Sequence, residues 1–242
     1  MVEQNRNLEN IKKIILVSAG KGGVGKSTIA TLLAMQLQNS GKNVGILDAD
    51  IYGPSIPTIL DIEDEVPNTE NNLFTPIISN GIKTNSIGYL VKPESALAWR
   101  GPMLTKALNQ LLFSTNWGEL DYLIVDMPPG TGDIHLSFAK MCKIDASVIV
   151  TTPDKIAQSD VQRAVDLYNK LNIPVAGIIE NMSYLLHNGE KMNVFGQGAS
   201  SRIAQKNKIN IIAKLPLIPS LAENKELYNS DNLKIDLSFL SF

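Results

Sequence analysis

Short apolar runs alternate along the chain with segments of helical periodicity. Six runs rich in Val, Ile and Leu are typical of strands covered on both faces: Ile14–Ser18, Val44–Asp48, Tyr122–Asp126, Ser147–Thr151, Val175–Asn181 and Asn210–Pro216. Between them, three segments predict helices: Lys26–Gln38, closed by Gly41; Pro102–Phe113, with proline in its first turn; and Ser159–Leu171, opened by a Ser-x-x-Gln capping box. This alternation predicts an α/β fold: a mostly parallel, doubly wound sheet with helices on both faces.

The remaining segments predict additions to a single domain that spans residues 1–242. The stretch "DIEDEVPNTENN" is acidic, polar and without periodicity, so we expect a surface excursion near 61–80. A second excursion, a loop near 184–196, follows the fifth predicted strand. The tail "LKIDLSFLSF" alternates apolar and polar residues, which predicts an edge strand.

Composition and charge narrow the class of protein. Hydrophobic residues make up 44% of the chain and charged residues 19%, which is ordinary for a globular protein. The net charge of -2 argues against a protein that binds the nucleic-acid backbone. The first residues lack the apolar region of a signal peptide, and no stretch approaches the ~18 uninterrupted apolar residues of a membrane span. We therefore expect a cytoplasmic protein that binds neither nucleic acid nor membrane.

The chain has one cysteine, Cys142. A single cysteine excludes an intrachain disulfide and any cysteine-only metal site made by one chain. We expect Cys142 to act as a small buried hydrophobe in a helix.

A phosphate-binding loop stands between the first predicted strand and the first predicted helix. Its residues fit G-x-x-x-x-G-K-[ST]: Gly20, Lys21, Gly22, Gly23, Val24, Gly25, Lys26 and Ser27. Glycines leave backbone N–H groups free to converge on phosphate oxygens, and the following helix adds its positive N-terminal dipole. We expect Lys26 to neutralise the β and γ phosphates and the Ser27 hydroxyl to bind Mg²⁺. Thr28 follows and completes the predicted nucleotide-binding set.

Carboxylates at the ends of two predicted strands complete the expected magnesium site. The sequence "LDAD" places Asp48 and Asp50 after the second strand, and "YLIVDMPPG" ends the third at Asp126. Mg²⁺ keeps several waters that anionic acceptors must hold, so Asp126 is interpreted as the Walker B residue and Asp50 as a second metal-site residue. A turn or helix-cap aspartate is the alternative for Asp50.

The segment "MPPGTGD" after Asp126 combines two prolines with two permissive glycines, so the Gly130 N–H could meet the γ phosphate. A segment that changes its contacts when that phosphate leaves acts as a switch; a plain proline-glycine turn is the alternative. The base is predicted to be adenine, because "NKLN" and "NKIN" both lack the final Asp of the guanine-binding N-K-x-D.

Six motifs in order give the chain a resemblance to a known family: "KGGVGKST", "LDADIYGPSIP", "WRGPM", "DYLIVDMPPGTGD", "VTTP" and "ENMS". Together they resemble the Mrp/ApbC iron-sulfur cluster carrier ATPases, which belong to the deviant Walker A class of P-loop NTPases. The resemblance covers about Ile14 to Pro219.

This resemblance implies an ATPase that works as a homodimer and delivers clusters to apoprotein clients. We expect Mg²⁺-dependent hydrolysis to be slow, because the switches must reorganise before the site is complete. It implies that Lys21, the signature lysine, reaches across to the partner's ATP and is catalytic together with Lys26, Asp50 and Asp126. Asp50 would position the attacking water or outer-sphere Mg²⁺. Asn181, with the segment "LPLIP", would hold the adenine.

The chain departs from the family pattern at the cluster ligands. In typical members a C-x-x-C pair follows "ENMS", and two chains share one 4Fe-4S cluster. Here His187 and Glu190 occupy that spacing, and neither binds an iron-sulfur core as thiolate does. Three functions stay open: an ATPase that carries clusters, with altered ligation; a nucleotide-switched scaffold that binds a protein partner; and a ParA-like or MinD-like positioning ATPase, which the net charge and the tail disfavour.

Overall fold

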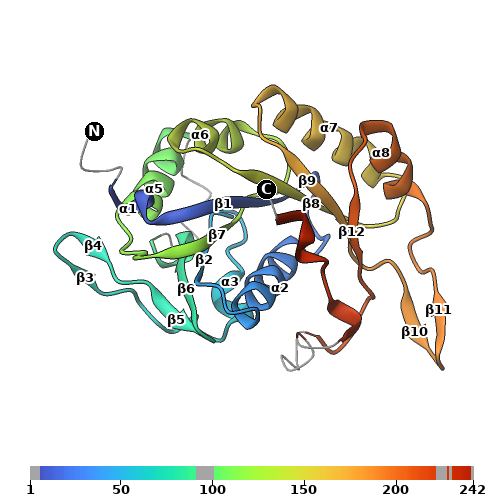
Figure 1. Cartoon of the computed structure of the whole chain (residues 1–242), viewed down its shortest axis with the longest axis horizontal. Coiled ribbons are helices and arrows are strands. Elements are labelled where there is room, and N and C mark those ends of the chain that lie inside the picture. The colour runs from blue at the N-terminus through green and yellow to red at the C-terminus, as the bar shows by residue number, and fades with distance from the viewer. Residues whose placement is uncertain (1–5, 91–100, 222–227, 229–230, 241–242) are drawn as a thin grey trace.

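A computed structural model describes residues 6–90, 101–221, 228 and 231–240. Its centre is an eight-stranded sheet in the order β12-β9-β8-β1-β7-β2-β6-β5, parallel except for β5 (Figure 1). The strands are β1 (Ile11–Ala19), β2 (Val44–Asp48), β5 (Ile77–Ser79), β6 (Ile82–Ser86), β7 (Leu120–Asp126), β8 (Ala146–Thr151), β9 (Val175–Glu180) and β12 (Ile211–Lys214). All six strands predicted from apolar runs lie in this sheet.

Helices cover both faces of the sheet, as predicted. Successive residues of β1 point to opposite faces: Ile14 and Leu16 pack in one hydrophobic cluster, and Ile15 and Val17 pack in the other. The first cluster includes residues of α5, α6, α7 and α8, and the second includes α2 (Figure 1). The helices are α1 (Arg6–Glu9), α2 (Lys26–Asn39), α3 (Ile56–Ile59), η1 (Ile87–Tyr89), α5 (Gly101–Phe113), α6 (Asp133–Met141), α7 (Ala157–Lys170) and α8 (Ala199–Asn207).

Strand β6 was not predicted, because its sequence is largely polar although most of it is buried. Each buried polar side chain has a hydrogen-bond partner. Thr84 Oγ1 donates to the Ile77 carbonyl (2.9 Å), and Asn85 Nδ2 donates to Thr115 Oγ1 (2.8 Å). Ser86 Oγ donates to an Asp48 carboxylate oxygen (3.1 Å). These bonds offset the cost of burying the groups, so hydropathy alone does not reveal the strand.

The edge strand predicted for the tail is wrong. The tail instead forms two short 3-10 helices, η3 (Asp231–Leu233) and η4 (Leu237–Leu240), and its apolar residues pack in the same cluster as α2. The Gln36 side chain holds the tail backbone by donating to the Leu233 carbonyl (2.7 Å) and accepting from the Ile235 N–H (3.0 Å). A side-chain amide thus satisfies backbone groups that a sheet would have paired.

The predicted capping box at Ser159 is also wrong, because α7 begins two residues earlier, at Ala157. Asp154 Oδ1 accepts the Ala157 N–H at 2.9 Å, so Asp154 satisfies one of the free donors at this helix start. Ser159 Oγ donates back to the Ile156 carbonyl at 3.2 Å.

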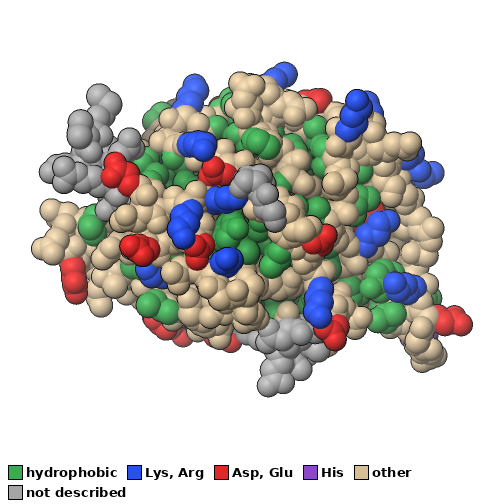
Figure 2. Space-filling view, in the orientation of Figure 1, with side chains coloured by type: hydrophobic (Ala, Val, Ile, Leu, Met, Phe, Trp, Pro, Cys, Tyr) green, Lys and Arg blue, Asp and Glu red, His purple; other side chains and the backbone are tan. Residues whose placement is uncertain are grey.

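Both expected excursions contain a small hairpin. In the first, β3 (Thr69–Glu70) pairs with β4 (Leu73–Phe74); in the second, β10 (Leu185–His187) pairs with β11 (Glu190–Met192), which projects from the body at the lower right of Figure 1. Charged side chains of both signs are interspersed on the face in Figure 2. None of the helices in the described part of the chain is long and apolar enough to span a membrane. The first two residues of "WRGPM" lie outside the described residues.

Candidate nucleotide-binding site

The predicted phosphate loop links the carboxyl end of β1 to the first turn of α2, next to a cavity of about 300 Å³. Two of its glycines, Gly23 and Gly25, have left-handed φ values of 78° and 81°. A Cβ at Gly25 would also lie 2.4 Å from Asn181 Nδ2. The sharp turn and the close approach of Asn181 both require glycine at this position. The cavity is lined by Lys21, Gly22, Gly23, Gly25, Lys26, Ser27, Thr28, Asp50, Gly53, Ser55, Ile59 and Pro129.

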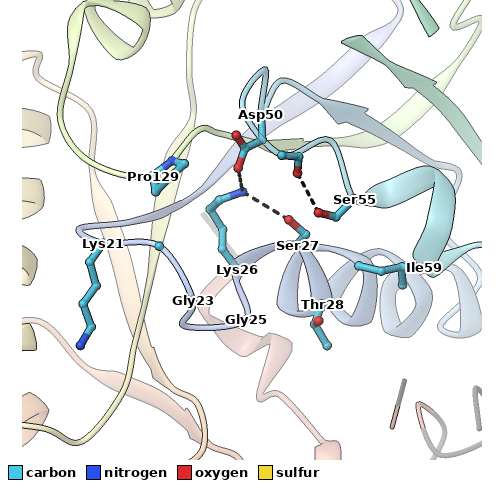
Figure 3. Close-up of a pocket in the computed structure, with 12 residues that line it drawn as sticks. Lys21, Gly23, Gly25, Lys26, Ser27, Thr28, Asp50, Ser55, Ile59 and Pro129 are labelled. Atoms are coloured by element: carbon cyan, nitrogen blue, oxygen red, sulfur yellow. Dashed lines mark hydrogen bonds and ion pairs between the residues drawn. The ribbon is translucent and has the colours of Figure 1, made fainter. Parts of the chain in front are cut away.

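Lys26 lies between two carboxylates that come from different strand ends, Asp126 and Asp50. Figure 3 shows its contacts with Asp50 and Ser27. Its Nζ is 2.5 Å from Asp126 Oδ1 and 3.2 Å from Asp50 Oδ2, and it lies 3.4 Å from Ser27 Oγ. The Lys26 and Asp126 side chains are buried, and Asp50 is nearly so. The structure therefore brings together the four residues predicted to handle phosphate and metal.

Burial raises the pKa of Asp126, and the charge of Lys26 and hydrogen bonds from Lys26 and Ser27 oppose that effect. Asp48 lies beside Asp126 in the β2–β7 register. Burial and the neighbouring Asp126 charge raise the pKa of Asp48 to about 8, against the backbone N–H groups of Asp50 and Ile56 that it accepts. Asp48 accepts these backbone groups and so supports the turn after β2, whereas Asp50 faces the cavity.

Two carboxylate oxygens at the site fit a magnesium ion that keeps its waters. Asp50 Oδ1 and Asp126 Oδ2 are buried and have no hydrogen-bond partner among the described residues. Within the same residues no group of three or more His, Cys, Asp or Glu could hold a metal directly. The donor set is thus suited to an ion bound by a hydroxyl, phosphate oxygens and waters, with carboxylates in the outer sphere.

The segment Met127–Gly132 runs from Asp126 past the cavity, where Pro129 forms part of the wall. Gly130 has a φ of 91°, and its N–H donates to the Ala19 carbonyl at 2.8 Å. The N–H that we expected to meet the γ phosphate is therefore bonded to the strand that carries the phosphate loop. It becomes available to a phosphate only when that bond opens.

Asn181 contacts the phosphate loop from the end of β9. Its Nδ2 donates to the Val24 carbonyl at 2.9 Å, and the residue is buried. Ser183 N–H donates to the Leu215 carbonyl (2.8 Å), which places the segment Leu215–Pro219 beside the same strand end. Asn181 keeps its side-chain carbonyl for an acceptor role.

A second cavity of about 270 Å³ shares Thr28 and Ile59 with the wall of the first. Its lining is mostly apolar and includes Ile218, Leu221 and Tyr228. Sequence reasoning missed Ile59 and Tyr228, because neither belongs to a motif. Only the segment "LPLIP" pointed to this slot, whose apolar lining is suited to a base.

Lys21 points away from Lys26 in Figure 3. Its Nζ lies 2.8 Å from Asp154 Oδ2, so the lysine predicted to act in trans is held by a residue of its own chain.

A ParA-group family model, described as NUBPL iron-transfer P-loop NTPase, matches residues 10–234. The chain belongs to this family. It is 53% identical over 216 residues to an iron-sulfur cluster carrier protein of Rickettsia conorii, which covers 89% of this chain and 65% of that relative. The chain thus spans about two thirds of the length of that carrier protein. The resemblance to the Mrp/ApbC carriers is confirmed.

Solved structures agree with this family. A nucleotide-binding protein of Archaeoglobus fulgidus, solved in complex with ADP, matches with a TM-score of 0.82 at 34% identity, over 100% of this chain and 96% of that chain. The cell-division ATPase MinD of Pyrococcus furiosus matches with a TM-score of 0.68 at 18% identity, over 95% of this chain and 97% of that chain, and shows the fold alone.

The segment after Asn181 lacks the cysteine pair that the resemblance led us to expect. His187 and Glu190 are cross-strand partners at the exposed end of the β10–β11 hairpin, which contains no cysteine. The expectation that Cys142 lies in a helix is wrong: it is the residue after α6, in an extended conformation just before β8, so it lies at the amino edge of the parallel sheet. The phosphate loop and Asn181 lie at the carboxyl edge. Burial raises the pKa of the Cys142 thiol to about 12, which disfavours the thiolate that iron requires.

Proposed function

We propose that this chain is a cytoplasmic, Mg²⁺-dependent ATPase that works as a homodimer in iron-sulfur cluster carriage and delivers clusters to apoprotein clients. The observation that carries the ATPase assignment is the placement of Lys26 between Asp126 and Asp50 beside the phosphate-loop cavity. Membership of the iron-transfer family supports the assignment to cluster carriage.

Nucleotide binding would exchange the partners of Lys26. Lys26 neutralises two carboxylates in the structure, and the β and γ phosphates of ATP offer the same negative charge. The loop amides and the start of α2 provide donors for the remaining phosphate oxygens. Ser27, Asp50 and Asp126 would hold Mg²⁺ directly or through water. When bound, the ion supplies positive charge that offsets the negative charge on the oxygens of the transferring phosphoryl group.

Hydrolysis requires a water molecule in line with the γ phosphate. It also requires positive charge that stabilises the negative charge of the transferring phosphoryl group. Asp50 borders the cavity and has a free buried carboxylate oxygen, so it can accept a hydrogen bond from that water. Lys21 of a second subunit would contribute the charge, in the manner of an arginine finger. Lys21 must leave Asp154, and the Gly130 N–H must leave Ala19, so we expect slow turnover.

The base would lie in the apolar slot between Ile59, Ile218 and Tyr228. The Asn181 side-chain carbonyl can accept a hydrogen bond from the exocyclic amine of adenine, because its amide nitrogen already donates to Val24. This arrangement favours ATP over GTP.

Anaerobic reconstitution with iron and sulfide tests the proposal for cluster carriage. If the chain carries clusters, the dimer retains iron and sulfide after desalting, shows visible charge-transfer absorption and activates an apoprotein. Variants His187→Ala and Cys142→Ser would then identify which side chain acts as a ligand. Absence of bound iron and of that absorption contradicts direct carriage by this chain, while phosphate release with ATP and Mg²⁺ tests the ATPase separately.

A second candidate function is a nucleotide-switched scaffold, favoured by the cysteine-free β10–β11 hairpin. In this function ATP closes the dimer around a protein partner, with no cluster involved. A pull-down with the ATP-bound chain would recover a partner that the ADP-bound chain does not. Equal recovery with both nucleotides, or none, contradicts this second candidate.

A further inference from the structure

A buried histidine joins the segment Met127–Gly132 to helix α7. His135 lies in the first turn of α6 and is only 1% exposed. Its Nε2 lies 3.0 Å from the Pro128 carbonyl oxygen, and its Nδ1 lies 3.0 Å from Tyr168 Oη. Both ring nitrogens thus form hydrogen bonds, Nε2 with the segment beside the nucleotide site and Nδ1 with helix α7.

The partners determine the direction of both hydrogen bonds. A carbonyl oxygen can only accept, so Nε2 must carry the ring proton and donate it to Pro128. Nδ1 of the neutral ring is then an acceptor, and the Tyr168 hydroxyl donates to it. The Ser18 side chain lies near that hydroxyl, where it opposes the rise in the pKa of Tyr168 that burial causes.

These contacts connect two parts of the nucleotide site through α7. Ser18 lies in β1, two residues before the phosphate loop, and Pro128 follows Asp126 by two residues. Helix α7 also packs on the loop itself, because a Cβ at Gly20 would lie 2.4 Å from the Asp160 backbone. A movement of Met127–Gly132 would therefore displace α7, and a movement of α7 would displace Met127–Gly132.

The segment Met127–Gly132 depends on outside groups for its placement. Pro128 and Pro129 have no N–H to donate, and Gly130 and Gly132 restrict the backbone little. The Met127 and Gly130 N–H groups bond to β1, at 3.0 and 2.8 Å. The Pro128 carbonyl lies between these two anchors, and the His135 ring holds it.

We propose that His135 is a positioning residue for the segment that carries Pro129 and Gly130 past the nucleotide. Its Nε2–H holds the Pro128 carbonyl, and Tyr168 holds the ring from α7. The consequence for hydrolysis rests on the proposed ATPase function, whereas the placement of the segment does not.

Two variants of His135 separate its two hydrogen bonds. The Gln amide nitrogen can reach the position of Nε2, so His135→Gln keeps the donor to Pro128. The Asn amide oxygen can reach the position of Nδ1, so His135→Asn keeps the acceptor for Tyr168 but loses the donor to Pro128. Tyr168→Phe removes the donor to the ring and leaves the Pro128 bond in place.

Hydrogen exchange of the Gly130–Asp133 amides, measured without nucleotide, reports directly how firmly the segment Met127–Gly132 is held. We expect exchange about tenfold faster in His135→Asn than in wild type, because the variant loses the net contribution of one hydrogen bond. His135→Gln should exchange at a rate close to that of wild type. Tyr168→Phe should lie between them. In the ATPase assay, His135→Asn should lower kcat about tenfold and change the Kd for ADP less than about twofold.

Wild-type exchange and turnover in His135→Asn would overturn the proposal. So would faster exchange throughout the protein with a parallel rise in the Kd, because that pattern marks a general loss of packing. If the wild-type chain hydrolyses no ATP, the proposed function fails, but the exchange difference between the Asn and Gln variants still decides the placement.

Discussion

Lys21 and Asp154 form an ion pair, with 2.8 Å between Nζ and Oδ2, that ties the phosphate loop to the segment after β8. Asp154 also accepts from Thr152 Oγ1 and from the Ala157 N–H. Burial disfavours the Asp154 carboxylate, yet these three hydrogen bonds outweigh burial and lower its pKa to about 2. Asp154 thus stays charged at neutral pH and retains Lys21 within its own subunit.

Releasing Lys21 should favour the ATP-bound dimer. Asp154→Asn removes the charge that holds Lys21, and a partly exposed ion pair contributes ~0.2–1 kcal/mol. The homodimer contains two such pairs, so we expect the ATP-dependent dimer to dissociate with a Kd about two- to thirtyfold lower than in wild type, measured by sedimentation with ATP and Mg²⁺.

The matched variant is Lys21→Ala. It should bind ATP nearly as well as wild type, because Lys26 and the loop amides remain, but it should lose ATP-dependent dimerisation. If Lys21→Ala dimerises with ATP like wild type, Lys21 does not act across the dimer.

The charge of Lys26 should stabilise the nucleotide-free protein. Its Nζ lies 2.5 Å from Asp126 Oδ1, and Asp126 is fully buried. Lys26→Met leaves that carboxylate uncompensated, so we expect the free energy of unfolding to fall by ~3–5 kcal/mol in urea denaturation without nucleotide. ATP binding should be lost as well.

The double variant Lys26→Met/Asp126→Asn removes both charges and provides the control. It should recover most of the lost stability while remaining unable to bind ATP. Equal stability of the single and double variants would show that Asp126 is not the group that Lys26 neutralises.

The sequence predicted the buried strands and the phosphate loop because each carries a local signal. Continuous apolar runs mark strands such as Val44–Asp48, which the structure reproduces residue for residue. The glycines of the loop mark a turn that only they can form. Asp50 and Asp126 follow, because parallel strands end at one edge of the sheet.

The parts that the sequence did not predict depend on long-range contacts. Strand β6 is polar and is recognised only when Asp48 and Thr115 are placed against it. The alternating pattern of the tail predicts a strand, because the sequence does not show that the Gln36 side chain of α2 binds the tail backbone. His135 belongs to no motif, and its role emerges only once Tyr168 is placed beside it.

Asn181 should affect ATP affinity through its contact with the phosphate loop. Asn181→Asp loses the donor to the Val24 carbonyl and brings a negative charge toward the nucleotide. We expect the Kd for ATP to rise about tenfold or more by calorimetry, since an unmade buried hydrogen bond costs ~1–3 kcal/mol. The control is Asn193→Ala in the exposed segment after β11, which should bind ATP like wild type. An unchanged Kd in Asn181→Asp would contradict a role for Asn181 in ATP binding.

His135 should make the stability of the protein depend on pH in the mildly acidic range. Burial lowers its pKa to about 4, with a smaller effect of the Lys26 charge in the same direction and an opposing one from the Pro128 carbonyl. The unfolded chain has a histidine pKa of ~6.5 and so binds a proton that the folded state does not bind between these values. The free energy of unfolding should therefore fall as the pH falls through this window, by roughly 3 kcal/mol at most, at about 1.4 kcal/mol for each pKa unit.

Gln does not titrate, so His135→Gln should lose this part of the pH dependence while retaining the part due to carboxylates. Urea denaturation of both proteins between about pH 4.5 and 7 measures the difference. Equal pH dependence in the two proteins would mean that His135 is not buried as a neutral ring.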